Sequence, residues 1–195
     1  GNIQPDLHNS GVDFAAWCTY KYLNSGPGSL SGVFVHENHA KNKNLPRFAG
    51  WWNHNKKTRF NMRQPFDVLE GAEGWQLSNL PILSMAAVKA SLDLFDEVGM
   101  DDLREKSEKL TGYFEFLINE IGSDDIKIIT PKNPKERGCQ LSIQVKNADK
   151  GLHKKLIEKH IITDWREPDV IRCAPVPLYN SFMDIYRFGQ ILKSY

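Results

Sequence analysis

Apolar positions in the first third of the chain form two short runs separated by turn residues. Val12–Trp17 (VDFAAW) and Ser31–His36 (SGVFVH) are short and rich in aromatic and aliphatic residues, which predicts two buried strands. Between them, Ser25–Ser29 (SGPGS) concentrates Gly and Pro, a composition typical of a tight reversal. Residues 37–80 scatter single aromatics among Asn, Lys, Gly and Pro without a period. They predict a long irregular segment, of the kind that is usually functional inside a compact domain.

Two helices are predicted next, because apolar residues recur there at helical spacing. The first begins at Pro81 and ends at Gly99. Its residues Ile82, Met85, Ala86, Ala90 and Leu94 lie near one face, which Leu83, Ala87 and Phe95 widen. The second begins at Asp101 or Asp102 and stops at Gly122, and its apolar side comprises Leu103, Leu110, Tyr113, Phe114, Leu117 and Ile121.

The last third of the chain changes character. Strands are predicted at Ile126–Thr130, Gln140–Val145, Ile161–Thr163 and Val170–Cys173, with helices at Leu152–Ile157 and Ser181–Leu192. The final helix directs Phe182, Ile185, Tyr186 and either Phe188 or Ile191 inward. This order predicts a small α+β domain with a largely antiparallel sheet. We place the boundary near residue 100, which gives domains at 1–99 and 100–195.

Composition narrows the possible functions. The 195 residues carry 25 Lys and Arg against 24 Asp and Glu, and this balance excludes a dedicated nucleic-acid binder. No apolar run is long enough to cross a membrane. Three cysteines without a CxxC pair indicate reduced thiols and a cytoplasmic location. The chain opens Gly1-Asn2-Ile3 without Met and completes no element before Val12, so we expect it to enter mid-structure.

Lys21 is the sharpest candidate for chemistry. It follows an apolar strand, precedes a glycine-rich loop and stands between Tyr20 and Tyr22. Partial desolvation favours the neutral, nucleophilic form of an amine, and such amines form Schiff bases with carbonyl substrates or with pyridoxal phosphate. The local sequence alone favours the simpler alternative of a surface lysine at a strand end, because lysines are usually exposed.

Arg172 is the second candidate, since it lies inside the apolar run Val170–Cys173. A guanidinium in such a strand is costly unless it is paired. Its partner is either a structural Asp or Glu or the carboxylate of a ligand held in a bidentate fork, and the residues alone do not choose between the two.

Two weaker patterns favour ordinary surface loops. His36, Glu37 and His39, with His54 nearby, lack the spacing of a metal site, so we expect no metal. Residues 51–63 mix tryptophans with lysines and arginines, as single-strand nucleic-acid binders do. The near-neutral total charge makes a solvated loop the better interpretation.

One longer segment, Phe14–Asn24 (FAAWCTYKYLN), resembles the cofactor-lysine segment of the kynureninase family of pyridoxal-phosphate enzymes, which have the aspartate-aminotransferase fold (fold type I). The resemblance covers essentially the whole chain. It continues through Gly26–Gly32, Phe34–Glu37, Gly50-Trp51, Thr58–Phe60, Ser78-Asn79, Pro81–Leu83, Leu110–Tyr113, Ile128–Pro131, Glu136–Leu141, Arg172 and Ala174–Phe182. Cysteine desulfurases of the same fold usually carry His before the lysine, where this chain has Tyr20.

The resemblance implies roles for five residues. Lys21 matches the lysine that holds pyridoxal phosphate covalently, and Tyr20 matches the tyrosine that contacts the cofactor phosphate. Trp51 and Asn79 match residues that reach the cofactor from the neighbouring subunit of a homodimer. Arg172 matches the arginine that binds the substrate α-carboxylate. His54 lies in a loop that the family uses around the aromatic substrate.

The implied fold is the end of a fold-type I large domain, 1–99, followed by the small domain, 100–195. The implied reaction hydrolyses L-kynurenine or 3-hydroxykynurenine to anthranilate or 3-hydroxyanthranilate plus L-alanine, and the sequence does not distinguish the two substrates. The family's Asp-x-x-His segment, its phosphate loop and the aromatic that stacks on the cofactor ring lie outside these residues. We therefore expect the chain to be the carboxy-terminal part of the enzyme and to be inactive alone. The alternatives are another fold-type I lyase or aminotransferase, or a non-catalytic interaction module.

Overall fold

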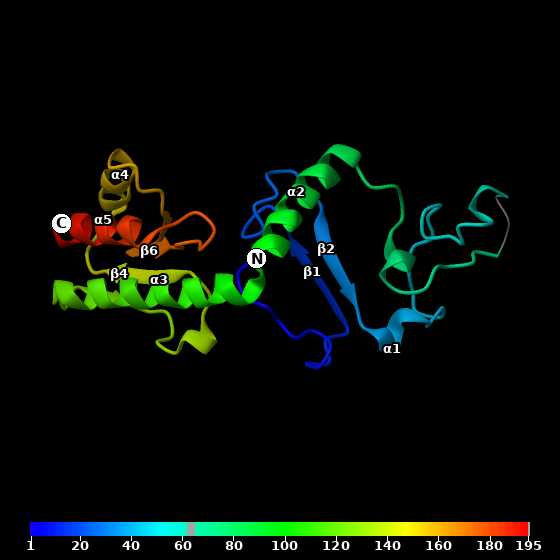
Figure 1. Ribbon diagram of the computed structural model, residues 1–195, viewed down its shortest axis with the longest axis horizontal. Helices are drawn as coiled ribbons and strands as arrows, with labels where there is room; N and C mark the ends of the chain where they lie inside the picture. Colours follow the sequence, from blue (N-terminus) through cyan, green and yellow to red (C-terminus); the bar gives the residue numbers. More distant parts are fainter. Residues whose placement is uncertain (62–64, 195) are drawn as a thin grey trace. The chain divides into compact units, whose positions relative to one another are not determined.

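The computed structural model describes residues 1–61 and 65–194, which form two compact units. One unit comprises Gln4–Glu97, and the other comprises Val98–Tyr195 together with Gly1–Ile3. Figure 1 shows the elements of each unit along the chain. Within the described ranges, no helix is long and apolar enough to cross a membrane.

The first unit contains an antiparallel hairpin of β1 (Phe14–Cys18) and β2 (Ser31–Val35), close to the predicted limits. The prediction of burial is wrong: neither strand holds a buried residue, because a hairpin of two strands buries little surface by itself. Trp17 lies directly opposite Gly32 in this pair. A side chain at position 32 would collide with the indole, so glycine leaves the room that the Trp17 ring occupies. In the connecting loop, Gly26 and Gly28 have φ values of 85° and 79°, which glycine adopts without steric cost.

The segment after the hairpin is largely irregular, as predicted. Among its described residues, 37–61 and 65–80, the helical elements are the short helix α1 (Glu37–Ala40) and the 3₁₀ turns η1 (Arg59–Asn61) and η2 (Ala72–Trp75). An edge-on contact between Phe14 and Trp75, with ring centroids 5.1 Å apart, ties this segment back to the hairpin.

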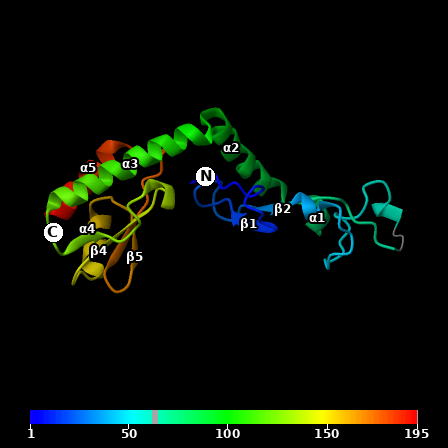
Figure 2. The ribbon, with the colours of Figure 1, turned by 90° about the horizontal axis from the view of Figure 1, so that it is seen from below.

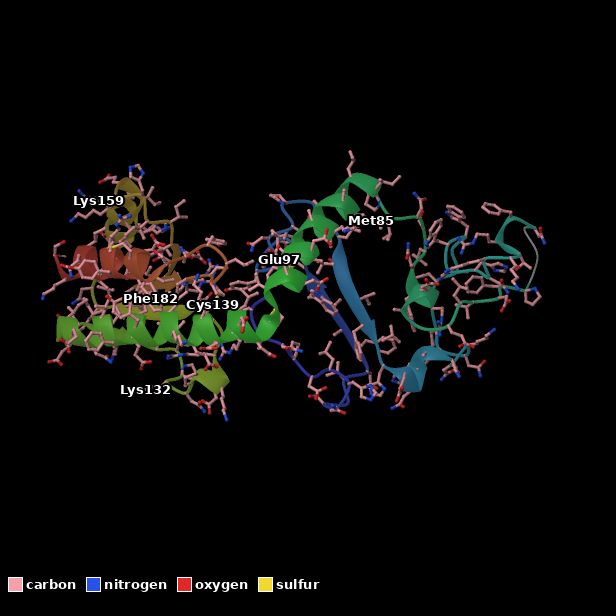
Figure 3. All side chains as sticks on the ribbon, in the orientation of Figure 1. Met85, Glu97, Lys132, Cys139, Lys159 and Phe182 are labelled. Atoms are coloured by element: carbon pink, nitrogen blue, oxygen red, sulfur yellow. The ribbon has the colours of Figure 1, made fainter. Side chains whose placement is uncertain are left out.

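Helix α2 (Ile82–Val98) runs beside the hairpin loop (Figure 1). Ser84 Oγ donates to the Gly28 carbonyl at 3.3 Å, and Ser91 Oγ donates to the Leu23 carbonyl. The buried residues of this helix are Ser91 and Phe95. The predicted apolar face is only partly buried: Phe95 is buried, whereas Ile82 is 81% exposed and Met85, labelled in Figure 3, is also exposed.

The second unit packs three helices against a four-stranded sheet, as the α+β pattern predicts. The helices are α3 (Met100–Ile121), α4 (Lys150–Glu158) and α5 (Phe182–Lys193), and a 3₁₀ turn, η3 (Pro134–Glu136), precedes the second strand. The strands are β3 (Ile126–Ile128), β4 (Leu141–Val145), β5 (Asp164–Arg166) and β6 (Val170–Cys173). Their order is β3-β4-β6-β5, and every neighbouring pair is antiparallel.

The hydrophobic core of this unit lies between one face of the sheet and the helices, with α3 and α5 side by side (Figure 2). Alternate residues of β4, namely Leu141, Ile143 and Val145, are buried there. The residues between them, Ser142 and Gln144, are polar and partly exposed, so they lie on the face of the sheet opposite the core.

Two details of the second unit differ from the sequence prediction. The strand predicted at Ile161–Thr163 lies instead at Asp164–Arg166. The chain first reverses after α4: His160 has a φ of 61°, and Ile161 N donates to the Leu156 carbonyl at 2.9 Å. On α5, Ile185, Phe188 and Leu192 are buried, whereas Phe182 (labelled in Figure 3) and Tyr186 are exposed.

Candidate active site

Lys21 lies in a tight turn that follows β1, and hydrogen bonds hold the backbone of this turn. Asn24 N donates to the Lys21 carbonyl at 2.9 Å, and Asn24 itself has a left-handed φ of 57°. Beneath the turn, the buried Ser25 hydroxyl donates to the buried Thr19 hydroxyl at 2.8 Å. These bonds fix the position from which the lysine side chain extends.

The amine of Lys21 is left available. The side chain is exposed, and it forms no ion pair within residues 1–61 and 65–194. Its Nζ lies 6.0 Å from the centre of the Tyr20 ring, which is about half exposed. A fixed backbone with an unpaired amine suits covalent attachment of an aldehyde better than a structural ion pair.

Trp51 belongs to a cluster of aromatic rings in the irregular segment. Its indole packs edge-on against Trp52 at 5.0 Å, while the Arg59 guanidinium lies 4.8 Å from the Trp52 ring. Arg59 Nη2 also donates to the Trp52 carbonyl at 2.9 Å. The cluster holds Trp51 with 45% of its surface exposed, so the ring is supported on one side and open on the other.

The buried side chain of Asn53 organises the loop that carries Trp51. Its Oδ1 accepts from Gly50 N at 2.9 Å, and its Nδ2 donates to the carbonyls of Phe48 and Gly74 at 3.1 Å. The residue has no exposed surface. Sequence reasoning missed Asn53, because a single Asn in a polar segment carries no signal of burial.

Asn79 lies beside this loop, since the segment just before it pairs with the Trp51 region. Trp52 N donates to the Leu77 carbonyl at 3.3 Å. Asn79 is exposed, and its Oδ1 accepts from Ser78 Oγ at 3.2 Å. The structure therefore brings together the segments of Trp51 and Asn79, which are separated by nearly thirty positions.

Arg172 lies on β6 in the second unit, and its partner there is a carboxylate of the chain itself. Arg172 Nη2 donates to Asp164 Oδ2 across the β5–β6 pair. The same Asp164 oxygen lies 3.0 Å from Arg166 Nη2. The sequence did not identify this partner. Because the strand was predicted at 161–163 and lies at Asp164–Arg166, the pairing of Asp164 with Arg172 was not predicted.

His54 is held in place by hydrogen bonds within its own segment. It is buried, its Nδ1 accepts from Asp67 N at 3.2 Å, and its Nε2 lies 3.2 Å from Thr58 Oγ1. In the described ranges no cluster of His, Cys, Asp and Glu is arranged to hold a metal ion. Arg63, at the end of the mixed basic and aromatic stretch 51–63, lies outside the described residues.

The donors of the first unit fit an anionic aldehyde. An available amine at Lys21, a phenol at Tyr20, an indole at Trp51 and an amide at Asn79 offer one nucleophile and three neutral hydrogen-bond donors, the kind that phosphate oxygens accept. Arg172, in the second unit, offers a cation that suits a carboxylate.

Comparison with solved structures defines the class of fold. The chain is similar to the cystine C–S lyase C-DES in complex with its product cysteine persulfide, with a TM-score of 0.74 and 17% identity over 97% of this chain and 48% of that one. It is also similar to the cysteine desulfurase CsdA from Escherichia coli, with a TM-score of 0.75 and 12% identity over 97% and 47%. The chain therefore has the fold-type I architecture, as the sequence predicts.

Comparison with curated proteins identifies the family. Residues 103–192 match the family model of the kynureninase C-terminal domain. Kynureninase from Myxococcus xanthus is 56% identical over 195 residues, which are 100% of this chain and 46% of that protein. Kynureninase from Flavobacterium psychrophilum is 55% identical over 99% of the chain and 46% of its own length. The chain belongs to the kynureninase family and corresponds to its carboxy-terminal part, spanning about half the length of the curated relatives it matches.

Proposed function

We propose that the chain is the carboxy-terminal part of a pyridoxal-phosphate-dependent kynureninase. The whole enzyme would hydrolyse L-kynurenine or 3-hydroxykynurenine to anthranilate or 3-hydroxyanthranilate and L-alanine, in tryptophan catabolism and NAD biosynthesis. One observation carries the proposal: relatives named kynureninase are 56% and 55% identical across nearly the whole of this chain. An amino-terminal part of the enzyme, as in those relatives, would complete the active site.

The two compact units are consistent with one cofactor-binding domain and one small domain. We assign residues 1–99 to the end of the large, cofactor-binding domain and residues 100–195 to the small domain. The division that the structure makes, between Glu97 and Val98, lies close to this boundary.

The first unit would hold the cofactor. Lys21 Nζ would bind its aldehyde carbon covalently, and Tyr20 would donate its hydroxyl to the phosphate. Trp51 and Asn79, which lie on adjoining segments, would contact the cofactor of the neighbouring subunit in a homodimer. Pyridoxal phosphate, when bound, supplies an electron-withdrawing ring that stabilises negative charge on the amino-acid substrate.

Two side chains of this chain would act on the substrate. Arg172 would bind the α-carboxylate through its guanidinium and thereby orient the amino acid for reaction. The Lys21 amine, once the substrate amine has taken its place, would remove the α-proton and later return a proton to the alanine product.

The compartment and assembly belong to the same proposal. Cys18 and Cys173 are free thiols, which suits a cytoplasmic enzyme. Burial raises the pKa of the Cys173 thiol, so this cysteine serves packing rather than chemistry.

The test is cleavage of L-kynurenine by the complete enzyme, followed by the fluorescence of anthranilate. We expect turnover in the wild type and none in Lys21→Ala, while Lys132→Ala, which changes an exposed lysine of the second unit, leaves the rate unchanged. Absence of cleavage in a folded, cofactor-loaded wild type would refute the proposal. The same assay on the 195 residues alone tests the prediction that they are inactive by themselves.

A second fold-type I activity is the alternative, and it is favoured by the likeness of fold to a lyase and a desulfurase. A substrate panel that includes cystine and cysteine separates the two. Release of sulfur from those substrates, without release of anthranilate from kynurenine, would favour the alternative.

A further inference from the structure

The sheet of the second unit carries a charged cluster of three residues, Asp164, Arg166 and Arg172. Asp164 and Arg172 are direct partners in the antiparallel pair of β5 and β6, so their side chains project from the same face. Arg166 stands two residues from Asp164 on β5 and shares that face. Asp164 Oδ2 accepts from Arg172 Nη2 and lies 3.0 Å from Arg166 Nη2.

The cluster lies on the face of the sheet that turns away from the core. The neighbouring residues on the same strands, Trp165 and Ile171, are buried among the helices. The side chains of Arg172, Asp164 and Arg166 are 33%, 44% and 57% exposed. Ion pairs this exposed add little to folding stability, so stability alone gives no strong reason for the arrangement.

The three charged groups of the cluster do not balance one another. Two guanidinium groups share a single carboxylate oxygen, and this leaves one net positive charge on a face open to ligands. One monovalent carboxylate from a ligand would balance it. Two other acids lie close by along the chain, and each has a partner of its own. Glu167 Oε1 lies 3.1 Å from Lys150 Nζ, and Asp169 accepts from Gln144 Nε2 at 3.2 Å.

Arg172 also depends on Asp164 for its orientation. Its Nε is buried without a hydrogen-bond partner in the described part of the chain. The guanidinium is therefore oriented by the bond from Nη2 to Asp164. A long, flexible side chain that is fixed before its ligand arrives loses less conformational entropy on binding.

We propose that Asp164 is a positioning residue for substrate binding: it holds the Arg172 guanidinium ready for the α-carboxylate, and Arg166 holds Asp164 when that carboxylate binds. This inference rests on the proposed function. The substrate carboxylate then joins the cluster as its second anion, bound to Arg172, while Asp164 stays paired with Arg166. The opposite possibility, that Asp164 competes with the substrate for Arg172, predicts the opposite change in KM.

The test compares variants of the complete enzyme with L-kynurenine as substrate. For Asp164→Ala we expect KM to rise about tenfold, the cost of ordering one long side chain, with kcat nearly unchanged. Asp164→Asn keeps the shape and a neutral acceptor, so its KM rises less, by about threefold. Arg166→Gln raises KM in the same direction without touching Arg172. Asp169→Ala and Asp169→Asn are the matched controls, and their KM stays at the wild-type value.

A substrate analogue without the carboxylate gives the decisive readout. The decarboxylated amine of kynurenine, used as a competitive inhibitor, should bind all these variants as it binds the wild type, because it makes no use of Arg172. An equal loss of affinity for both molecules would mean a merely structural role and would overturn the inference. An unchanged or lowered KM in the Asp164 and Arg166 variants would overturn it as well.

The outcomes also separate this inference from the proposed function. A wild type that cleaves kynurenine, with Asp164 variants that keep its KM, refutes the positioning role alone. A wild type that does not cleave kynurenine refutes the function and this inference with it. Asp164→Asn and Arg166→Gln, which change exposed polar side chains, keep the test decisive if Asp164→Ala is poorly folded.

Discussion

Gly50 packs against the backbone of Leu77, so the residue before Trp51 touches the segment that leads to Asn79. A Cβ at Gly50 would lie 2.7 Å from the Leu77 carbonyl carbon, and backbone atoms cannot turn aside as a flexible side chain can. This close approach holds the loop that carries Trp51 against the segment that leads to Asn79. Glycine is required here by space rather than by a special backbone angle.

Gly50→Ala should therefore separate the two segments. We expect a lower melting temperature and weaker binding of pyridoxal phosphate by the complete enzyme, measured by thermal unfolding and by titration with the cofactor. Gly112→Ala is the matched control, because a Cβ there meets open space on α3. That variant should be as stable as the wild type or more stable, by up to about 1 kcal/mol. Equal behaviour of the two variants would contradict the steric account.

Asn53→Ala should loosen the Trp51 loop from within. The substitution removes three hydrogen bonds and leaves the Gly50 amide and two carbonyls without their partner. Each buried donor or acceptor that is left without a partner destabilises the folded protein by about 1–3 kcal/mol. We expect faster hydrogen exchange in residues 48–53 and weaker cofactor binding. Asn55→Ala removes hydrogen bonds to Asp67 Oδ2 and from Lys57 N, but these groups are accessible to water, which can replace the lost partner. It should therefore change both much less, and comparable effects would count against the role of Asn53.

Removing one partner of the ion pair between Arg137 and Glu115 should lower the free energy of unfolding. Arg137 is almost fully buried, and its Nη2 lies 2.8 Å from Glu115 Oε2. Glu115→Gln leaves a buried guanidinium uncompensated and should destabilise the second unit by about 3 kcal/mol. The double variant Glu115→Leu with Arg137→Met should recover much of this loss, as urea unfolding would reveal. A single variant as stable as the wild type would disprove the burial argument.

The capping box at the start of α5 should make stability depend on pH. Backbone and side-chain hydrogen bonds from Ser181 lower the pKa of Asp184 in the folded protein. A lowered folded pKa means that the contribution is complete above the unfolded value, about 4, and is lost as the pH falls through the folded pKa.

Ser181→Ala should then cost about 1 kcal/mol near neutral pH. Asp184→Asn should be less stable than the wild type above about pH 5, with the difference shrinking as the pH falls below 4. Melting temperatures of the wild type and both variants across pH 3–7 measure this. A difference that stays constant down to pH 3 would contradict the linkage.

Periodicity in the sequence predicted most elements of the second unit, because this unit has its own core. Leu110, Phe114 and Ile143 repeat at helical or strand spacing and are buried as expected. The same reasoning located α2, but on its predicted apolar face Phe95 is buried whereas Ile82 is exposed in this chain. Hydrophobic spacing indicates a face that can be buried, but it does not say which segment covers it.

The site was harder to derive than the fold. Lys21 and Arg172 stand out as charged residues in apolar surroundings, and the family resemblance gave them roles. Asn53 and Asp164 carry no such signal, because their importance comes from contacts that the tertiary structure makes. The shift of β5 by three residues shows the limit: only the pairing of Asp164 with Arg172 reveals the carboxylate that holds the arginine.

The most direct test of the central claim is to locate the cofactor on the chain. The complete enzyme is loaded with pyridoxal phosphate, reduced with borohydride, digested and examined by mass spectrometry. We predict that the added mass of the reduced cofactor lies on Lys21 and disappears in Lys21→Ala. Attachment to another lysine, or no attachment in a cofactor-loaded enzyme that cleaves kynurenine, would contradict the account.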